Sequence, residues 1–514
     1  MDAIREKLVA MENPAPIAIA VTVAIAIITT RLLSGSRGQN AKDGFLSPSL
    51  PPYWAPFLGH IPQMVIGGAG FMPRLLKSHP EGIFSLQLLG SIHSYVTRPA
   101  FATVVMNKPE SVASEKWLHK RLMLTNFGFA KSDTQLLDEI FPPLHDLYQL
   151  LLSGPSLADL TDSTISTLKA RIADFVTFNS QPADQMEWEQ LAGADVVDDG
   201  KGGKVVEVDL MSLTKNFVAH VATPSFFGTD FVANFPDYFQ HLWAFDEQFF
   251  LLMAGLPSWF PYPPLQRVHR ARRKLLSYME EFHDAMDKHV NGQDPGPRWQ
   301  DLDNVGYLIR KRMDVYHEHK VQTRVRAAVE MSLTWATNAN SNPLIFWSIF
   351  ELCRDRVLLA QVREEIAPYV EVVEPQNEFG LAVWMAPEFK KLDMDGLLTK
   401  CPLLKAVYAE TLRVYTNGYT LKYMQQDVTL GKPGDPAGSY MLKEGTYAHV
   451  AAEMHQRDPV YYPDPEEWQA ARHVKEVVDE KGNKTLTADL GTMRPYGTFS
   501  YYFHPQPRCL ETEC

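Results

Sequence analysis

The stretch that decides the fold is Glu410-Thr-Leu-Arg413, which is followed later in the chain by Asp464-Pro-Glu-Glu-Trp468 and by Arg472. A glutamate and an arginine three positions apart share one face of a helix, and an arginine from a later loop can complete a charge-assisted triad with them. An apolar stripe can form on that helix from Leu403, Leu404, Val407 and Leu412, so we expect both charges to be buried. Buried charges persist only when they are paired, and the sequence therefore predicts a structural triad of Glu410, Arg413 and Arg472. The alternative is a solvated helix pair without a third partner.

A second polar motif interrupts a long apolar helical pattern that runs from Arg324 to Leu352. It reads Thr334-Trp-Ala-Thr-Asn-Ala-Asn-Ser-Asn-Pro343, and Trp347 follows it. A proline inside a helical pattern predicts a kink or an end of the helix. One interpretation is therefore a polar patch at a kink with no chemical role.

The order and spacing of these motifs, together with Met493-Arg-Pro-Tyr-Gly497, make the chain resemble the cytochrome P450 family of haem-thiolate monooxygenases. The resemblance covers about residues 46–497. It implies a mainly helical fold with a small N-terminal β-sheet, which short apolar segments at 83–89 and 94–105 are expected to form. It also implies that the Glu410–Arg413–Arg472 triad is a scaffold for the haem pocket.

In that family, the long central helix carries an acid followed by threonine over the distal face of the haem. Asn340 stands at the position of the acid and Ser341 at that of the threonine, and Ala336 is a further candidate for haem contact. This variant resembles the branch of sterol 7/12-alpha-hydroxylases and prostacyclin synthase. An amide cannot donate a proton as a carboxylic acid does. One possibility is that Ser341 and ordered water deliver the protons. The other is that the haem rearranges an oxygenated substrate, a reaction that needs no protons.

Cationic side chains are expected to neutralise the haem propionates, and the candidates are Arg494, Lys422 and His145. The segment Trp117-Leu-His-Lys-Arg121 matches the Trp-x-x-x-Arg pattern of the family but lies early for the corresponding helix. A single histidine or lysine is more often a solvated or capping side chain. The sequence leaves these alternatives open.

The loop that should provide the axial cysteine departs from the family pattern. When the loop is aligned on Tyr496-Gly497, Phe503 occupies the position of the axial cysteine. Cys509 lies six residues later and is a candidate ligand of the haem iron that is out of register. The change after Gly497 is abrupt, which predicts a truncated or mis-spliced C-terminus that binds haem poorly. A haem-free descendant of the family is the alternative.

Composition limits the classes of partner. The net charge of −12 over 514 residues is dispersed, so a nucleic-acid surface is not expected. Four cysteines without metal-finger spacing indicate a reducing, cytosol-facing chain.

The N-terminal region predicts attachment to a membrane. Residues 15–33 are apolar apart from Arg31 and reach about 28 Å as a helix, and basic residues follow them. We expect a single-pass signal anchor in the endoplasmic reticulum membrane, with the body facing the cytosol. An interfacial or buried helix is the alternative. The predicted organisation is a lumenal leader (1–14), the transmembrane anchor (15–33), a linker with a proline-rich strap (34–62), an incomplete cytochrome P450 domain (63–497) and an atypical tail (498–514).

The resemblance implies a function in secondary metabolism. A haem-dependent monooxygenase would take electrons from an NADPH-cytochrome reductase and oxidise a hydrophobic sterol, terpenoid, polyketide or fatty acid, with impaired activity in this chain. One alternative is a haem isomerase or dehydratase of oxygenated lipids. The other is a haem-free, membrane-tethered protein that binds an apolar ligand.

Overall fold

A computed structural model describes residues 15–493, and the chain forms two compact units. The positions outside the described part of this span are 37–39, 43, 254, 374–386, 417–418, 433, 436–437, 479–481, 483 and 492. The first unit, called the sheet unit, combines residues up to Trp117 with Asn417–Pro465. The second, called the helical unit, combines Leu118–Thr416 with Glu466–Gly491.

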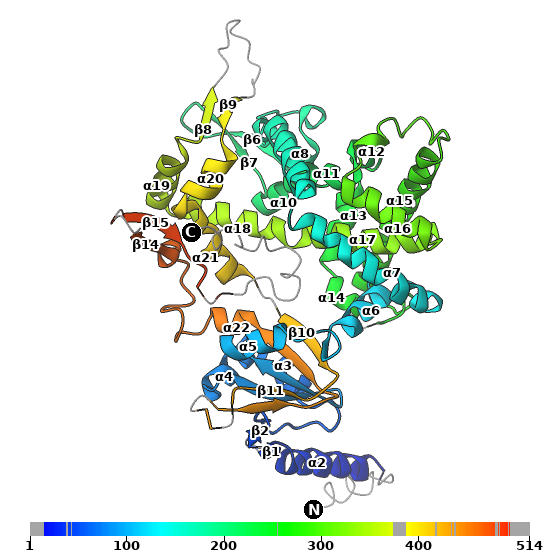
Figure 1. Cartoon of the computed structure of the whole chain (residues 1–514), viewed down its shortest axis with the longest axis vertical. Helices are drawn as coiled ribbons and strands as arrows, with labels where there is room; N and C mark the ends of the chain where they lie inside the picture. Colours follow the sequence, from blue (N-terminus) through cyan, green and yellow to red (C-terminus); the bar gives the residue numbers. More distant parts are fainter. Residues whose placement is uncertain are drawn as a thin grey trace, which may run out of the picture. The chain divides into compact units, whose positions relative to one another are not determined.

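The sheet unit is built on a five-stranded sheet that combines strands from residues 83–114 with strands from residues 419–451 (Figure 1). Its strands follow the order β3 (Ile83–Leu88), β4 (Ser91–Val96), β13 (Tyr447–Ala451), β10 (Tyr419–Met424) and β5 (Ala113–Ser114). Strands β4 and β13 are parallel, and the other neighbours are antiparallel. A second sheet has the order β1 (Asn40–Lys42), β2 (Phe45–Leu46), β12 (Tyr440–Leu442) and β11 (Val428–Leu430).

Alternating side chains bury both faces of the five-stranded sheet. Ile83 and Val96 pack with Phe101 of helix α5 (Pro99–Met106) on one face. On the other face, Phe84 packs with Phe71 of helix α4 (Phe71–Ser78). The apolar segment at 94–105, with its break at Pro99, was predicted to belong to the sheet, but only residues up to Val96 do so. The part after the break is wrong as a strand, because Pro99 has the fixed φ that suits the first turn of helix α5. The remaining helices of this unit are α2 (Ala15–Leu33), α3 (Ile61–Gly67) and α22 (Ala452–Gln456).

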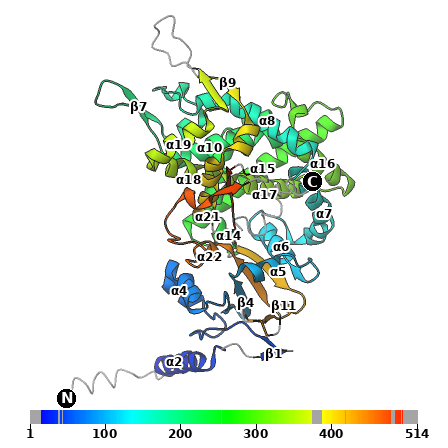
Figure 2. The same cartoon turned by 60° about the vertical axis from the view of Figure 1, so that its left-hand side comes forward.

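The helical unit is centred on three helices that pack around a large apolar core (Figure 2). These are α15 (Pro263–Val290), α16 (Tyr307–Glu318) and α17 (Thr323–Ala339), and α18 (Ser341–Arg354) continues α17 after a break. The other helices that position the candidate site are α10 (Leu210–Ala222), α13 (Tyr238–Asp246), α14 (Phe249–Met253), α19 (Arg356–Ile366), α20 (Met394–Lys400) and α21 (Pro402–Tyr415).

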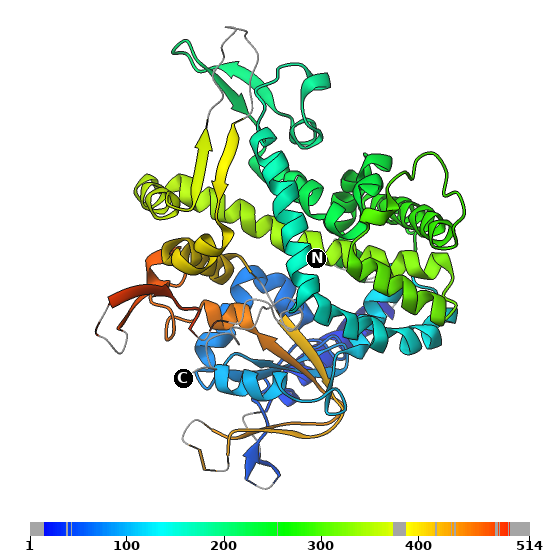
Figure 3. The ribbon, with the colours of Figure 1, turned by 45° about the horizontal axis from the view of Figure 1, so that its top comes forward.

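Peripheral helices and hairpins complete the helical unit. The helices are α6 (Lys116–Thr125, which begins in the sheet unit), α7 (Thr134–Asp146), α8 (Pro155–Arg171), α9 (Glu187–Ala192), α11 (Pro224–Phe227) and α12 (Thr229–Asn234). Hairpins β6–β7 (Asp195–Asp198, Lys204–Glu207) and β8–β9 (Val370–Val373, Glu388–Leu392) project from one end of the unit (Figure 3). A third hairpin pairs β14 (Val474–Val478) with β15 (Lys484–Ala488). The predicted mainly helical fold with a small sheet is confirmed.

The predicted membrane anchor forms helix α2, Ala15–Leu33. Its apolar side chains are exposed, including those of Ile19, Ile28 and Leu33. Within the described part of the chain, however, no helix meets the length and hydrophobicity that a membrane crossing requires. The prediction of a transmembrane helix is therefore not supported.

Candidate active site

Glu410 and Arg413 lie on helix α21, which begins at Pro402. The apolar side of α21 packs through Val407 against Val362 of α19 and Ala470, so the helix is held from two directions. This packing places both charged side chains in the interior, where neither has any exposed surface. Arg413 Nε lies 2.8 Å from Glu410 Oε2, and Arg413 Nη2 lies 2.8 Å from Glu410 Oε1. The pair is therefore bidentate, which is the strong geometry for a guanidinium and a carboxylate.

The structure brings the third predicted member to the same carboxylate. Arg472 lies on the short 3-10 helix Ala470–His473, and its Nε is 2.9 Å from Glu410 Oε1. Arg413 and Arg472 also both donate to the backbone carbonyl of Glu467, at 3.0 and 3.2 Å. These bonds fasten the loop at Glu467 to helix α21, beside the β14–β15 hairpin (Figure 1). The predicted role of the cluster as a scaffold for the haem pocket stays a prediction.

Glu410 has a third side-chain partner, which the sequence did not predict. His473 Nε2 lies 2.9 Å from Glu410 Oε2, and His473 Nδ1 lies 3.0 Å from the carbonyl oxygen of Asp489. Both neighbours are hydrogen-bond acceptors, so both ring nitrogens can donate only in the imidazolium form. The one signal in the sequence was the position of His473 directly after Arg472.

The ionisation of Glu410 reflects these donors. Burial raises the pKa of the Glu410 carboxyl, but hydrogen bonds from Arg413, His473 and the backbone N–H of Gln469 lower it, and the resulting pKa is about 2. Glu410 is therefore ionised at neutral pH, and the cluster is a fixed charged junction.

The second predicted motif lies at the break between α17 and α18. Helix α17 ends at Ala339, α18 begins at Ser341, and Asn340 stands between them with φ −97° and ψ −45°. Pro343 has no backbone N–H to donate to the carbonyl of Ala339, which accounts for the interruption at this point. The side chains compensate locally: Asn340 Nδ2 donates to the Ala336 carbonyl at 3.1 Å, and Ser341 Oγ donates to the Thr337 carbonyl at 3.0 Å.

Four short side chains lie around this break. Asn340 and Ser341 are exposed, and Ala336 and Thr337, in the last turn of α17, are half-buried. Short side chains leave room for a flat macrocycle, so these residues fit the haem that the resemblance implies. Arg494 and Cys509, and with them the axial-ligand loop, lie outside the described residues.

The other predicted haem contacts have local partners. In the sheet unit, Lys422 Nζ lies 3.3 Å from Glu115 Oε1 and 3.2 Å from the carbonyl oxygen of Met106. In the helical unit, His145 Nδ1 lies 3.7 Å from the carboxylate of Asp146. These contacts give Lys422 and His145 structural roles, and a role in haem binding stays a prediction for both.

The Trp-x-x-x-Arg segment is helical, since Trp117 and Arg121 both belong to α6. In the sheet unit, the Trp117 ring lies 5.4 Å from that of Tyr447. In the helical unit, Arg121 Nη2 donates to the Met253 carbonyl at 2.8 Å.

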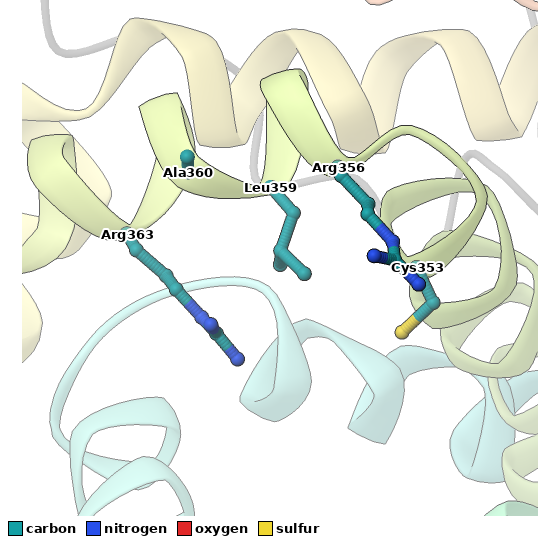
Figure 4. A pocket seen from close by; sticks show the side chains of 5 residues that line it. All are labelled: Cys353, Arg356, Leu359, Ala360 and Arg363. Atoms are coloured by element: carbon teal, nitrogen blue, oxygen red, sulfur yellow. The ribbon is translucent and has the colours of Figure 1, made fainter.

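Two cysteines lie in the described part of the chain, and their surroundings differ. Cys353, at the end of α18, is exposed and lines a surface pocket with Arg356, Leu359, Ala360 and Arg363 of α19 (Figure 4). The view shows Cys353 beside Arg356, with Leu359 between the two arginines. Cys401 is fully buried before α21. Burial raises the pKa of the Cys401 thiol, and the Glu365 carboxylate adds to the increase.

We therefore expect iodoacetamide to modify Cys353 at least about tenfold faster than Cys401 in the folded protein, because alkylation requires access and a thiolate. Peptide mapping by mass spectrometry measures both rates in one sample. In urea the two rates should become similar. Equal rates in the folded protein would contradict the burial of Cys401.

Comparisons with known proteins identify the family of the chain. The family model described as Cytochrome P450 matches residues 204–487, more than half of the chain. The relative "Cytochrome P450 monooxygenase efuG" of Hormonema carpetanum is 25% identical over 462 residues, which cover 86% of this chain and 74% of that protein. "Cytochrome P450 7A1" of Oryctolagus cuniculus is 22% identical over 431 residues, covering 84% and 76%. "Cholesterol 7-alpha-monooxygenase" of Cricetulus griseus is 25% identical over 234 residues, covering 45% and 40%.

Proposed function

Since the chain belongs to the cytochrome P450 family, we propose that it binds haem and inserts an oxygen atom from O₂ into a hydrophobic small molecule. The observation that supports this proposal most is the break between α17 and α18, where Asn340 and Ser341 are exposed on a face of small side chains. When bound, the haem would supply the activation of dioxygen. Electrons would come from NADPH through a separate reductase.

Each residue of the break has a distinct role in this proposal. Ala336 and Thr337 leave room for the edge of the macrocycle. The Ser341 hydroxyl, held by the Thr337 carbonyl at 3.0 Å, can pass a proton to a group on the exposed face. Asn340, whose amide donates to the Ala336 carbonyl at 3.1 Å, orients neighbouring groups but transfers no proton as an acid would.

Asn340 also favours a second function. A haem enzyme that rearranges or dehydrates an oxygenated lipid requires no proton delivery from solvent. An amide at this position would therefore not impair its reaction. The two functions differ in their co-substrates. A monooxygenase consumes NADPH and O₂, whereas an isomerase or dehydratase converts a lipid peroxide without either.

We propose a sterol or a related polycyclic lipid as the substrate. The name of the Cricetulus griseus relative contains cholesterol, and other relatives carry the general name of monooxygenase. Terpenoids, polyketides and fatty acids remain alternatives within the same class of apolar substrates.

Haem binding tests the proposal directly. About one haem per chain in the full-length purified protein, with the Soret band of a thiolate-ligated haem in its reduced carbon monoxide complex, would support the proposal. It would also contradict the expectation from the sequence that a chain with Phe503 at the ligand position binds haem poorly. Cholesterol is then the first probe of the substrate pocket, with the spectral shift of the ferric haem as the readout. The absence of haem after expression with excess haem precursor would overturn the monooxygenase proposal and favour a haem-free binding protein.

We also propose that helix α2 attaches the protein to the endoplasmic reticulum membrane, with the catalytic body in the cytosol. The exposed apolar side chains of Ile19, Ile28 and Leu33 support this attachment, since an apolar helix surface is stabilised by contact with lipid.

Deletion of residues 1–33 is therefore expected to move most of the protein from the membrane pellet to the supernatant after cell lysis. A variant with Ile19, Val23 and Ile27 replaced by serine should behave similarly, because it keeps the helix length but loses apolar area. Sedimentation followed by immunoblotting measures the distribution. Retention of both variants in the pellet would contradict attachment through α2.

A further inference from the structure

The surface pocket at Cys353 combines a thiol with two guanidinium groups. Its volume is about 550 Å³, which lies in the range of small-molecule sites. All of its lining residues belong to the helical unit. Cys353 is separated from Ser341 by about 18 Å of helix along α18, so the pocket is distinct from the candidate active site.

The sequence of α19 sets two arginines on one outer face of the helix. Residues at positions i, i+3, i+4 and i+7 share a face, and Arg356, Leu359, Ala360 and Arg363 have this spacing. The other side of α19 packs inward through apolar side chains such as Val362. Arg356 and Arg363 are therefore two turns apart, about 10.5 Å along the helix axis.

The turn between α18 and α19 brings the thiol to this face. Helix α18 ends one residue after Cys353, and Asp355 is extended, with φ −107° and ψ 97°, so the chain changes direction before α19. The Asp355 carboxylate fixes the new helix by accepting hydrogen bonds from two backbone N–H groups of its first turn, at 3.0 Å each. As a result, Cys353 lies beside Arg356 at one end of the pocket, and Arg363 lies at the other end (Figure 4).

The two guanidinium groups are available to an anion. Arg356 and Arg363 are exposed, and their guanidinium groups make no hydrogen bond or ion pair with any described residue. The neighbouring carboxylates have other partners: Glu351 pairs with Arg354 at 3.0 Å, and Glu365 accepts from two backbone N–H groups of α21 at 2.9 and 2.8 Å. Guanidinium groups bind carboxylates through charge-assisted hydrogen bonds. This arrangement points to an anionic ligand independently of the thiol.

A ligand that suits both features is a disulfide that carries carboxylates. An extended tripeptide spans roughly 10 Å, so a tripeptide with a carboxylate at each end matches the spacing of Arg356 and Arg363. The side chain of Leu359 lies between the two arginines and can support the middle of such a ligand. We propose that Cys353 forms a mixed disulfide with an acidic thiol tripeptide of the glutathione type. This site goes beyond the proposed monooxygenase function and does not depend on it.

The reaction is a thiol–disulfide exchange. The Cys353 thiolate attacks one sulfur of the symmetric disulfide, whose S–S bond breaks while a new S–S bond joins Cys353 to one tripeptide. The other tripeptide leaves as a thiolate and takes up the proton that the Cys353 thiol lost. The Cys353 sulfur is oxidised and the departing sulfur is reduced, so the disulfide itself is the oxidant. An excess of the reduced tripeptide reverses the step.

The charge selectivity of the modification tests the site. The full-length protein is incubated with glutathione disulfide, which is anionic, or with bis(2-hydroxyethyl) disulfide, which is neutral. Peptide mapping by mass spectrometry measures both rates at Cys353. We expect Arg356→Gln/Arg363→Gln to lower the ratio of the anionic to the neutral rate about tenfold, because two charge-assisted contacts are lost. The ratio cancels any change in the thiolate fraction of Cys353, which affects both reactions equally.

Arg354→Gln is the matched control. Arg354 directly follows Cys353 in the chain, but it pairs with Glu351 at 3.0 Å and does not line the pocket. At an ionic strength of about 0.15 M, more distant surface charges are largely screened, so this variant should change the rate ratio less than about twofold. Arg356→Lys/Arg363→Lys should give an intermediate ratio, since lysine keeps the charge and loses the planar fork. Circular dichroism checks that each variant is folded.

The outcomes decide the proposal in both directions. A lower ratio in the double glutamine variant, with little change in Arg354→Gln, supports the site. An equal fall in Arg354→Gln would show that general positive charge selects the anion, and an unchanged ratio in the double variant would show that Cys353 is only an accessible thiol. Either result, or the absence of the mixed disulfide, would overturn the proposal. The assay uses neither haem nor turnover, so failure of the monooxygenase function would leave its result intact.

Discussion

Replacing Arg413 with alanine is expected to destabilise the protein by about 3–5 kcal/mol, because it leaves the carboxylate of Glu410 buried without its bidentate partner. Arg472 and His473 would still contact Glu410, at 2.9 Å each, but the Glu467 carbonyl would lose one of its two arginine donors. We expect a steep loss of soluble, folded protein and a lower midpoint of thermal unfolding. Circular dichroism and the soluble yield measure both effects.

Arg298→Ala is the matched control for this experiment. Arg298 makes an ion pair with Glu281 at 2.9 Å, but the two side chains are 52% and 43% exposed. Exposed pairs contribute about 1 kcal/mol or less, so this variant should unfold nearly as the unaltered protein does. Arg413→Lys should lie between the two, since lysine keeps the charge and loses the planar fork. Similar stabilities for Arg413→Ala and Arg298→Ala would show that the buried cluster is not a structural junction.

Acid is expected to destabilise the protein by on the order of 3 kcal/mol through Glu410 alone as the pH falls from about 5 to about 2. The folded pKa of about 2 lies below the usual pKa of an unfolded glutamate, near 4.3. Between these values the unfolded state binds more protons, so protonation favours unfolding. The contribution of Glu410 is therefore complete above about pH 5 and lost as the pH approaches 2.

Glu410→Gln tests the origin of this pH dependence. The amide cannot ionise, so the variant should be less stable at pH 7 but should lose less additional stability between pH 5 and pH 3 than the unaltered protein. Urea unfolding at a series of pH values, followed by circular dichroism, measures the difference. Parallel curves for the two proteins would assign the acid sensitivity to other carboxylates, such as Asp287 or Asp133.

The two polar regions have different physical characters. Around Glu410, all the donors converge on one carboxylate and fix it. Along α17, Glu330 Oε2 and Asn338 Oδ1 are buried and lack partners among the described residues. A fully paired cluster stabilises one arrangement of the backbone, so we expect variants of the Glu410 cluster to affect folding.

The sequence by itself determined the features that depend on short-range periodicity. The spacing of Glu410 and Arg413 places them on one helical face whatever the rest of the fold, and an apolar stripe beside them makes burial necessary. Pro343 likewise predicts the interruption between α17 and α18, because a proline cannot supply the hydrogen bond that a continuous helix needs. The mainly helical class followed from the resemblance that these motifs support, and it is confirmed.

Only the tertiary structure decided the partners that come from distant segments. It brought His473 to Glu410, and it paired Lys422 with Glu115, leaving the predicted haem contact a proposal. It also placed Tyr238 of α13 beside Thr334 of α17. Such contacts depend on how helices and strands cross, and no local period in the sequence encodes the crossing. Local patterns therefore fixed which side chains must be buried, and the packing of remote elements fixed what each of them contacts.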